Sequence, residues 1–142
     1  MKSLMQLLQA KGREVHSIDL NARVYDALKL MAEKDVGALI VTEGGRLAGI
    51  ISERDYARKV ILHGKSSHDI AVREIMTAKV VTVQRAQTVE DCMALMTARR
   101  VRHLPVMDGD QLIGILSIGD LVKEVMAEQE QTIKQLESYI HS

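Results

Sequence analysis

One short pattern occurs twice in the sequence, starting at Gly49 and again at Gly114, an offset of 65 residues. Each copy reads glycine, two aliphatic residues, serine, two variable residues and aspartate. The same offset aligns further identical residues without a gap, among them Val24 with Val89, Asp26 with Asp91, Leu39 with Leu104, and Gly44 with Gly109. Chance does not keep two segments in register over such a length, so the chain is an internal duplication.

The size of the chain limits how such a duplication can fold. With 142 residues, 46% of them hydrophobic, it can form one ordinary domain or two half-size units that share a core. A single repeat would bury its apolar surface poorly, because small chains have a high ratio of surface to volume. We therefore expect the two repeats to pack on each other.

Composition argues against several classes of function. The 19 basic residues balance the 19 acidic ones, and three tyrosines are the only aromatic residues, which is atypical of proteins that bind nucleic acid. No apolar run approaches the length of a membrane span, and residues 1–10 lack the features of a signal peptide. The single cysteine, Cys92, predicts a reducing compartment. We expect the cytoplasm, although a processed organellar protein would look the same.

The spacing of apolar residues predicts a β-α-β-β-α order in each repeat, and so an α+β fold. For the first repeat we expect a strand at 15–18, a helix at 24–34, hairpin strands at 37–42 and 47–51, and a helix at 52–62. For the second we expect a strand at 80–83, a helix at 88–99, hairpin strands at 103–107 and 112–116, and a helix from residue 117. A short helix at 3–10 precedes the first repeat, and one helical turn at 72–76 precedes the second.

These elements divide the chain into five expected segments. They are an N-terminal helix and lead-in (1–14), the first repeat (15–63), a linker and lead-in (64–79), the second repeat (80–127) and a C-terminal helical extension (128–142). In the extension, apolar residues continue at spacings of three and four up to Ile140, and neither Pro nor Gly interrupts them. One long amphipathic helix that forms a dimer contact is expected. A frayed or back-folded tail is the alternative.

The repeated pattern places a serine and an aspartate where a strand leads into a helix. The first turn of a helix has unpaired N–H groups and a positive dipole end, which suits a phosphate group. Ser52 and Ser117 can add a hydrogen bond to the anion, while Asp55 and Asp120, three residues later, can accept from the two hydroxyls of a ribose. The structural alternative is a capping box, in which the serine and the acid only close the helix end. Capping alone does not explain the glycine that begins each copy.

Together, the duplicated β-α-β-β-α unit and the glycine–serine–aspartate pattern resemble a CBS domain pair, the Bateman module. The resemblance covers about residues 15–126. The second repeat also has Val101-Arg102-His103-Leu104-Pro105-Val106 and Ile75-Met76-Thr77, which are similar to two further motifs of that family. The resemblance implies a stand-alone regulatory module, not an enzyme, that binds an adenine nucleotide in the cleft between its repeats. The family includes binders of AMP, ADP, ATP, NAD(H) and S-adenosylmethionine, and members with no known ligand.

The resemblance also implies which residues form each site. In one site Ser117, Gly119 and Asp120 would hold phosphate and ribose, and Thr77, Arg102, His103, Leu104 and Pro105 would surround the nucleotide. In the other site the corresponding residues are Gly12, Gly37, Ala38, Ser52 and Asp55. There Ile40 stands in place of Pro105, so the first repeat departs from the family pattern.

The two sites differ in charge. Arg54 and Arg58 lie near the first helix start, where the second repeat has Gly119 and Lys123. A ligand with more phosphates, or a dinucleotide, would favour the arginine-rich site because arginine makes forked contacts with phosphate. The alternative is that both arginines belong to a solvated helix face.

Other side-chain combinations are weaker candidates for chemistry. His63, His68 and Asp69 could bind a metal, but a flexible linker is the better interpretation, and no metal site is expected. Cys92 lies on a helix beside Met93 and is interpreted as a core residue rather than a nucleophile. No set of catalytic groups or catalytic cofactor site can be assembled from the sequence. The leading hypothesis is a nucleotide sensor that acts through conformational or dimer changes on an unknown effector protein; the alternative is an interaction module with vestigial ligand sites.

Overall fold

A computed structural model describes residues 1–12 and 14–141. The chain forms two compact units, and each contains one repeat. The first-repeat unit comprises residues 14–80, and the second-repeat unit comprises 1–12 together with 81–141. The N-terminal segment therefore belongs to the unit of the second repeat. The packing of one repeat on the other stays a prediction.

The first-repeat unit is built on a three-stranded sheet with the order β1-β2-β3. Strand β1 (Ser17–Asp19) runs parallel to β2 (Ala38–Glu43), and β2 is antiparallel to β3 (Arg46–Ser52). The helical elements are α2 (Val24–Lys34), α3 (Glu53–Lys59), and the 3₁₀ turns η1 (Ile61–His63) and η2 (Val72–Glu74). Gly44 and Gly45 both adopt positive φ in the β2–β3 turn, a conformation that glycine reaches without strain.

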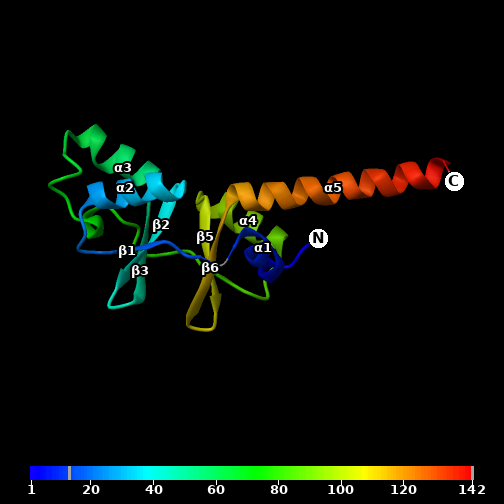
Figure 1. The fold of residues 1–142 in the computed structure, drawn as a ribbon, viewed down its shortest axis with the longest axis horizontal. Coiled ribbons are helices and arrows are strands. Elements are labelled where there is room, and N and C mark those ends of the chain that lie inside the picture. Colours follow the sequence, from blue (N-terminus) through cyan, green and yellow to red (C-terminus); the bar gives the residue numbers. More distant parts are fainter. Residues whose placement is uncertain (13, 142) are drawn as a thin grey trace. The chain divides into compact units, whose positions relative to one another are not determined.

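The second-repeat unit repeats this architecture with the sheet order β4-β5-β6. Figure 1 shows its antiparallel strands β5 and β6. Its elements are α1 (Leu4–Lys11), β4 (Val83–Gln84), α4 (Val89–Arg99), β5 (His103–Asp108), β6 (Gln111–Ser117) and α5 (Ile118–His141). Both hairpins have a register shift at the same relative place, after Val41 in the first and after Val106 in the second. The internal duplication is thus confirmed down to an irregularity of the sheet.

Several expected elements have other bounds, and three of them show how. The first strand covers residues 17–19 instead of 15–18, and the strand expected at 80–83 is only Val83–Gln84. The ends of both strands are set by their parallel partners, β2 and β5, rather than by local sequence. The helix expected at 52–62 ends at Lys59, after which the chain tightens into η1 and reaches Gly64 in a left-handed conformation.

Each unit is completed by the segment that precedes the opposite repeat. In the second-repeat unit, Leu4, Leu7 and Leu8 of α1 join a buried core with Leu104 and Leu116. Figure 1 shows α1, from the start of the chain, beside β6 and α4. In the first-repeat unit, residues of the 72–77 segment play the same part. Val72 and Ile75 pack with Leu39 and Ile51 of the sheet.

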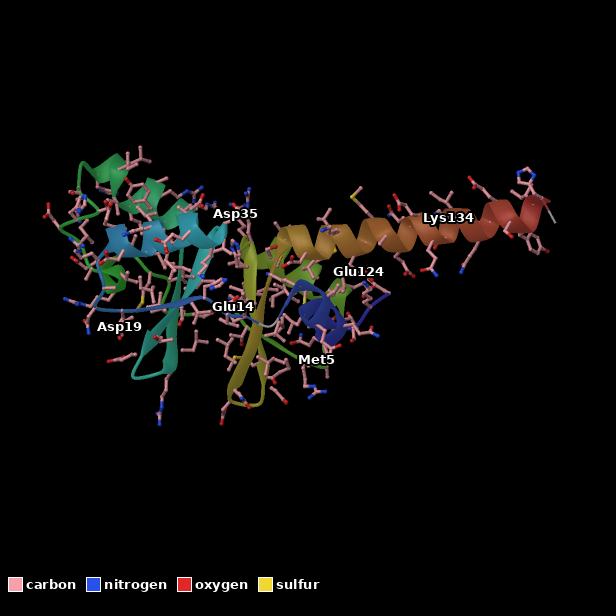
Figure 2. All side chains as sticks on the ribbon, viewed as in Figure 1. Met5, Glu14, Asp19, Asp35, Glu124 and Lys134 are labelled. Atoms are coloured by element: carbon pink, nitrogen blue, oxygen red, sulfur yellow. The ribbon has the colours of Figure 1, made fainter. Side chains whose placement is uncertain are left out.

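The long C-terminal helix is confirmed, since α5 has 24 residues. Its first turns pack into the second-repeat unit through Leu121, and its far half extends beyond α1 and α4 in Figure 1. Glu124 is the one buried charged residue in the described part of the chain, and it accepts a hydrogen bond of 2.7 Å from the backbone N–H of Lys2. Figure 2 shows Glu124 on the side of α5 that faces the N-terminal segment. None of the described helices is long and apolar enough to cross a membrane.

Candidate functional site

The first Ser-x-x-Asp pair lies where β3 passes into α3. Ser52 has extended backbone dihedrals and is the N-cap of α3. The backbone N–H of Ser52 donates to Asp55 Oδ2 at 2.9 Å, and its hydroxyl lies 3.1 Å from the same oxygen. In return, the N–H of Asp55 donates to Ser52 Oγ at 3.2 Å. The pair therefore forms a complete capping box.

The second pair has the same geometry between β6 and α5. The N–H of Ser117 donates to Asp120 Oδ2 at 2.8 Å, and the N–H of Asp120 donates to Ser117 Oγ at 3.2 Å. The first N–H of each helix is also satisfied, because Glu53 donates to the carbonyl of Gly37 and Ile118 to the carbonyl of Arg102. An anion at either helix start would thus have to share or replace the N–H donors of the first and third helical residues, which already have acceptors.

The glycine that begins each pattern has a structural explanation. A Cβ on Gly49 would lie 2.7 Å from the carbonyl oxygen of Thr77, and a Cβ on Gly114 would lie 2.5 Å from a methyl carbon of Leu8. Both distances are well below van der Waals contact. The glycines therefore make room for the lead-in segments, a requirement separate from helix capping.

A lysine contacts each aspartate, and neither lysine was identified from the sequence. Lys11 Nζ, from α1, lies 2.7 Å from Asp120 Oδ2 and donates to the carbonyl of Ile115 at 2.9 Å. Lys59 Nζ lies 3.3 Å from Asp55 Oδ1 and donates to the carbonyl of Ile75 at 2.9 Å. The spacing of four residues between Asp55 and Lys59 could have revealed the first-repeat pair. No local signal reveals Lys11, because it comes from the opposite end of the chain.

The electrostatics of the second-repeat site centre on Asp120 and His103. Burial raises the pKa of Asp120, but hydrogen bonds from Lys11 and Ser117 outweigh this effect, so its pKa lies below the ordinary value. Burial lowers the pKa of His103, and the charges of Lys11 and Arg102 lower it further against the opposing effect of Asp120. His103 is directly opposite Ser117 across the β5–β6 ladder. The site therefore holds an ionised carboxylate, an ammonium group and a half-buried imidazole.

Thr77 and Gly12 each lie in the unit of the repeat opposite to their own, and their expected places in the two ligand sites stay a prediction. Thr77 exchanges backbone hydrogen bonds with Ile50 of β3, at 2.9 and 3.0 Å, and so lies in the unit of Ser52 and Asp55. Gly12 ends α1 in the second-repeat unit, directly after Lys11. Alignment of the repeats placed each residue with its own repeat, whereas the lead-in segments pack on the opposite one.

The remaining candidates fall into buried and exposed groups. The side chains of Leu104, Pro105 and Ala38 are buried in their sheets, so only their backbone atoms could face a ligand. Arg54, Arg58, Arg102 and Gly119 are exposed, and Gly37 is half-buried.

The weaker candidates have structural roles. Cys92 is fully buried in the core, and burial raises its thiol pKa to about 11, with a further contribution from Asp91. That confirms its interpretation as a core residue. The His68 ring stacks on the Tyr25 ring with centroids 4.2 Å apart. Among residues 1–12 and 14–141, no three metal-binding side chains are grouped as a metal site would require.

Comparisons with known proteins agree on one family. The family model for the CBS domain matches residues 11–62 and 72–127. The CBS domain-containing protein CBSX3, mitochondrial, of Arabidopsis thaliana is 46% identical over 97% of this chain and 71% of its own. The structure of a putative signal-transduction protein with CBS domains from Burkholderia ambifaria is 55% identical, with a TM-score of 0.87 over 90% of this chain and 96% of the other.

A more distant structure shares the fold alone. The CBS domain pair of protein MJ0100 is 22% identical, with a TM-score of 0.79 over 90% of this chain and 98% of the other. It was solved in complex with 5′-methylthioadenosine and S-adenosyl-L-methionine.

Proposed function

Because this chain belongs to the CBS domain family and contains a pair of CBS repeats, we propose that it is a non-enzymatic regulatory module that binds an adenine nucleotide of the AMP, ATP or NAD(H) type. The observation that carries the proposal is the group of Lys11, His103, Ser117 and Asp120 around the start of α5. It combines a carboxylate suited to ribose hydroxyls with cations suited to phosphate. Adenosine-containing ligands in the distant MJ0100 structure support this ligand class.

The chemistry of binding at this site is an exchange of partners. Asp120 stays ionised near neutral pH and can accept two hydrogen bonds from ribose hydroxyls. Lys11, released from Asp120 or shared with it, would turn to the phosphate. The backbone groups of Arg102 and Leu104 would face the adenine ring. Since Asp120 and Lys11 are only partly exposed, their mutual attraction must be replaced by comparable contacts with the ligand.

The first-repeat site would favour a ligand with more negative charge. Ser52 and Asp55 have the same geometry there, while Arg54 is exposed in the first turn of α3 and Arg58 is exposed in its last turn. Two guanidinium groups favour a polyphosphate or a dinucleotide over AMP. Thr77, which joins β3 by backbone hydrogen bonds, would border this site in place of Gly12.

Binding would be transmitted through a homodimer to an effector protein. A ligand can shift a conformational equilibrium only by its difference in affinity between the two states. The reducing environment expected for a chain with one free, buried cysteine makes the cytoplasm our proposed location. The Arabidopsis relative is named a mitochondrial protein.

Thermal unfolding in the presence of AMP, ADP, ATP, NAD⁺, NADH and S-adenosylmethionine tests this function. A ligand at about 100 times its dissociation constant stabilises by about 2.7 kcal/mol, which corresponds to several degrees at roughly 2–4 °C per kcal/mol. We expect at least one nucleotide to raise the melting temperature, and the Asp55→Ala/Asp120→Ala double variant to abolish the shift.

Asp91→Ala is the matched control for the double variant. Asp91 caps α4 through the same reciprocal bonds with Thr88, but it belongs to neither candidate site. The control should lose stability as the double variant does and keep the full response to nucleotide. An unchanged response in the double variant, or no response from protein freed of bound ligand, would defeat the proposal.

An interaction module with vestigial ligand sites is the second candidate. It is favoured by the complete capping boxes, since both serine–aspartate pairs already satisfy one another. In that case α5 would be the functional element. A chain ending at Ala127 should then lose its partner protein, while nucleotides have no effect on full-length protein.

A further inference from the structure

The α5 helix has an exposed apolar stripe on the face away from its own unit. Its residues are spaced alternately by four and three positions: Val122, Met126, Gln129, Ile133, Leu136 and Ile140. The five apolar side chains have exposed fractions of 40%, 58%, 55%, 58% and 75%, whereas Leu121 and Glu124 on the inner face are at 0% and 6%. The alternating spacing of four and three residues along this exposed stripe is the a/d pattern of a coiled coil.

We propose that this α5 stripe pairs with the α5 stripe of a second copy of the chain, in antiparallel orientation. Val122 of one copy then faces Ile140 of the other, Met126 faces Leu136, and Gln129 faces Ile133. All six stripe residues of both copies are covered in this register. The 24 residues span about 36 Å, long enough for three heptads.

Charges beside the stripe favour the antiparallel orientation. Lys123, Glu130 and Glu137 occupy one flank, seven residues apart, and an antiparallel pair brings like flanks together. Lys123 of each copy then meets Glu137 of the other, giving two opposite-charge pairs, and the helix dipoles oppose one another favourably. Glu130 of each copy lies opposite Glu130 of the other copy, which is the one repulsive contact along this flank. A parallel pair would place Glu130 and Glu137 opposite Val125 and Thr132, with no opposite charges.

Coverage of the stripe and the flank charges together select the register. A shift of one heptad in one direction brings Glu130 against Glu137 of the other copy and leaves Val122 and Met126 uncovered. A shift in the other direction pairs Lys123 with Glu130 of the other copy but leaves Leu136 and Ile140 uncovered. The proposed register is therefore the only one of the three that covers the whole stripe and pairs Lys123 with Glu137 twice. Pairing of the two α5 helices requires no nucleotide.

The mass in solution of full-length protein without ligand tests the pairing. Light scattering after gel filtration should give twice the chain mass of 15.8 kDa. Leu136→Glu would bury two carboxylates against Met126 and should raise the dimer dissociation constant at least about tenfold. Gln135→Glu adds the same charge on the neighbouring, outward position and should leave the dimer unchanged. A monomeric wild type, or a Leu136→Glu variant as dimeric as wild type, would overturn the proposal.

Charge reversal tests the orientation. Lys123→Glu and Glu137→Lys should each weaken the dimer, since either substitution creates two pairs of like charges between residue 123 of one copy and residue 137 of the other. The double variant Lys123→Glu/Glu137→Lys should restore it. Within one helix these residues are about 21 Å apart, too far for a mutual contact, so rescue can arise only between antiparallel copies. The antiparallel register would be ruled out by single variants that dimerise like wild type, or by a double variant whose dimer is weaker than that of either single variant.

Discussion

At the residue scale, Gly49 shows how a repeated motif residue can serve packing rather than ligand binding. Gly49→Ala would place a methyl group 2.7 Å from the Thr77 carbonyl oxygen and 2.9 Å from Met76 Sδ. We expect it to lower the free energy of unfolding by about 1–3 kcal/mol, the range for overpacking, as measured by urea denaturation. Gly119→Ala is the matched control, because its Cβ would lie at an ordinary 3.6 Å from Ser117 Oγ. Equal stability of the two variants would contradict this explanation.

His103 links stability to pH in a defined direction. Its pKa in the folded protein is lowered, first by burial and then by Lys11 and Arg102. As pH falls below about 6.5, the unfolded chain binds a proton before the folded chain does, so stability declines with falling pH. His103→Gln should therefore flatten the dependence of the unfolding free energy between pH 7.5 and 5.5. A variant with the same slope as wild type would show that His103 does not contribute.

Residues also differ in how far the sequence alone can place them. Ser52, Asp55, Ser117 and Asp120 were identified because their pattern is local and occurs twice. Lys11 was missed because its contact with Asp120 joins residues 109 positions apart. A lysine at the end of a short helix has no sequence feature that names such a distant partner.

At the element scale, prediction succeeded where an element contains its own boundary signals. The helix expected at 24–34 is α2, and the one expected from Thr88 is α4 with Thr88 as its cap. Prediction failed at β1 and β4, whose ends are set by parallel pairing with distant strands. The lead-in elements were recognised, but their places were not, because nothing local shows which sheet a short apolar helix will cover.

Each lead-in segment packs on the repeat opposite to the one that it precedes, and this packing leads to a further prediction. Leu8 and Val72 are both almost fully buried, Leu8 in the second-repeat unit and Val72 in the first-repeat unit. Each substitution to a smaller side chain leaves a cavity, which for Leu8→Ala costs about 2–5 kcal/mol. In hydrogen exchange, Leu8→Ala should reduce protection in β5 and β6, and Val72→Ala in β2 and β3. The reverse pattern would contradict the observed packing.

At the scale of the whole molecule, the fold class and the two-fold repetition follow from the sequence, because binary patterning and an offset of 65 residues are global features of it. The division into units did not follow. Sequence order suggested that each repeat is a continuous segment with its own preceding helix. The contacts instead assign residues 1–12 to the last repeat and leave residues 14–80 as the only continuous unit.

This discontinuity makes the first repeat, in effect, a cassette inserted into the second. Residues 1–12 and 81–141 form one core although 68 residues separate them in the chain. A protein engineer could therefore excise the cassette and join Gly12 to Val81 through a flexible linker, keeping every segment of the remaining core. Cutting the chain between the repeats, at the linker where a tandem array is ordinarily divided, would instead strip each half of the segment that covers its sheet.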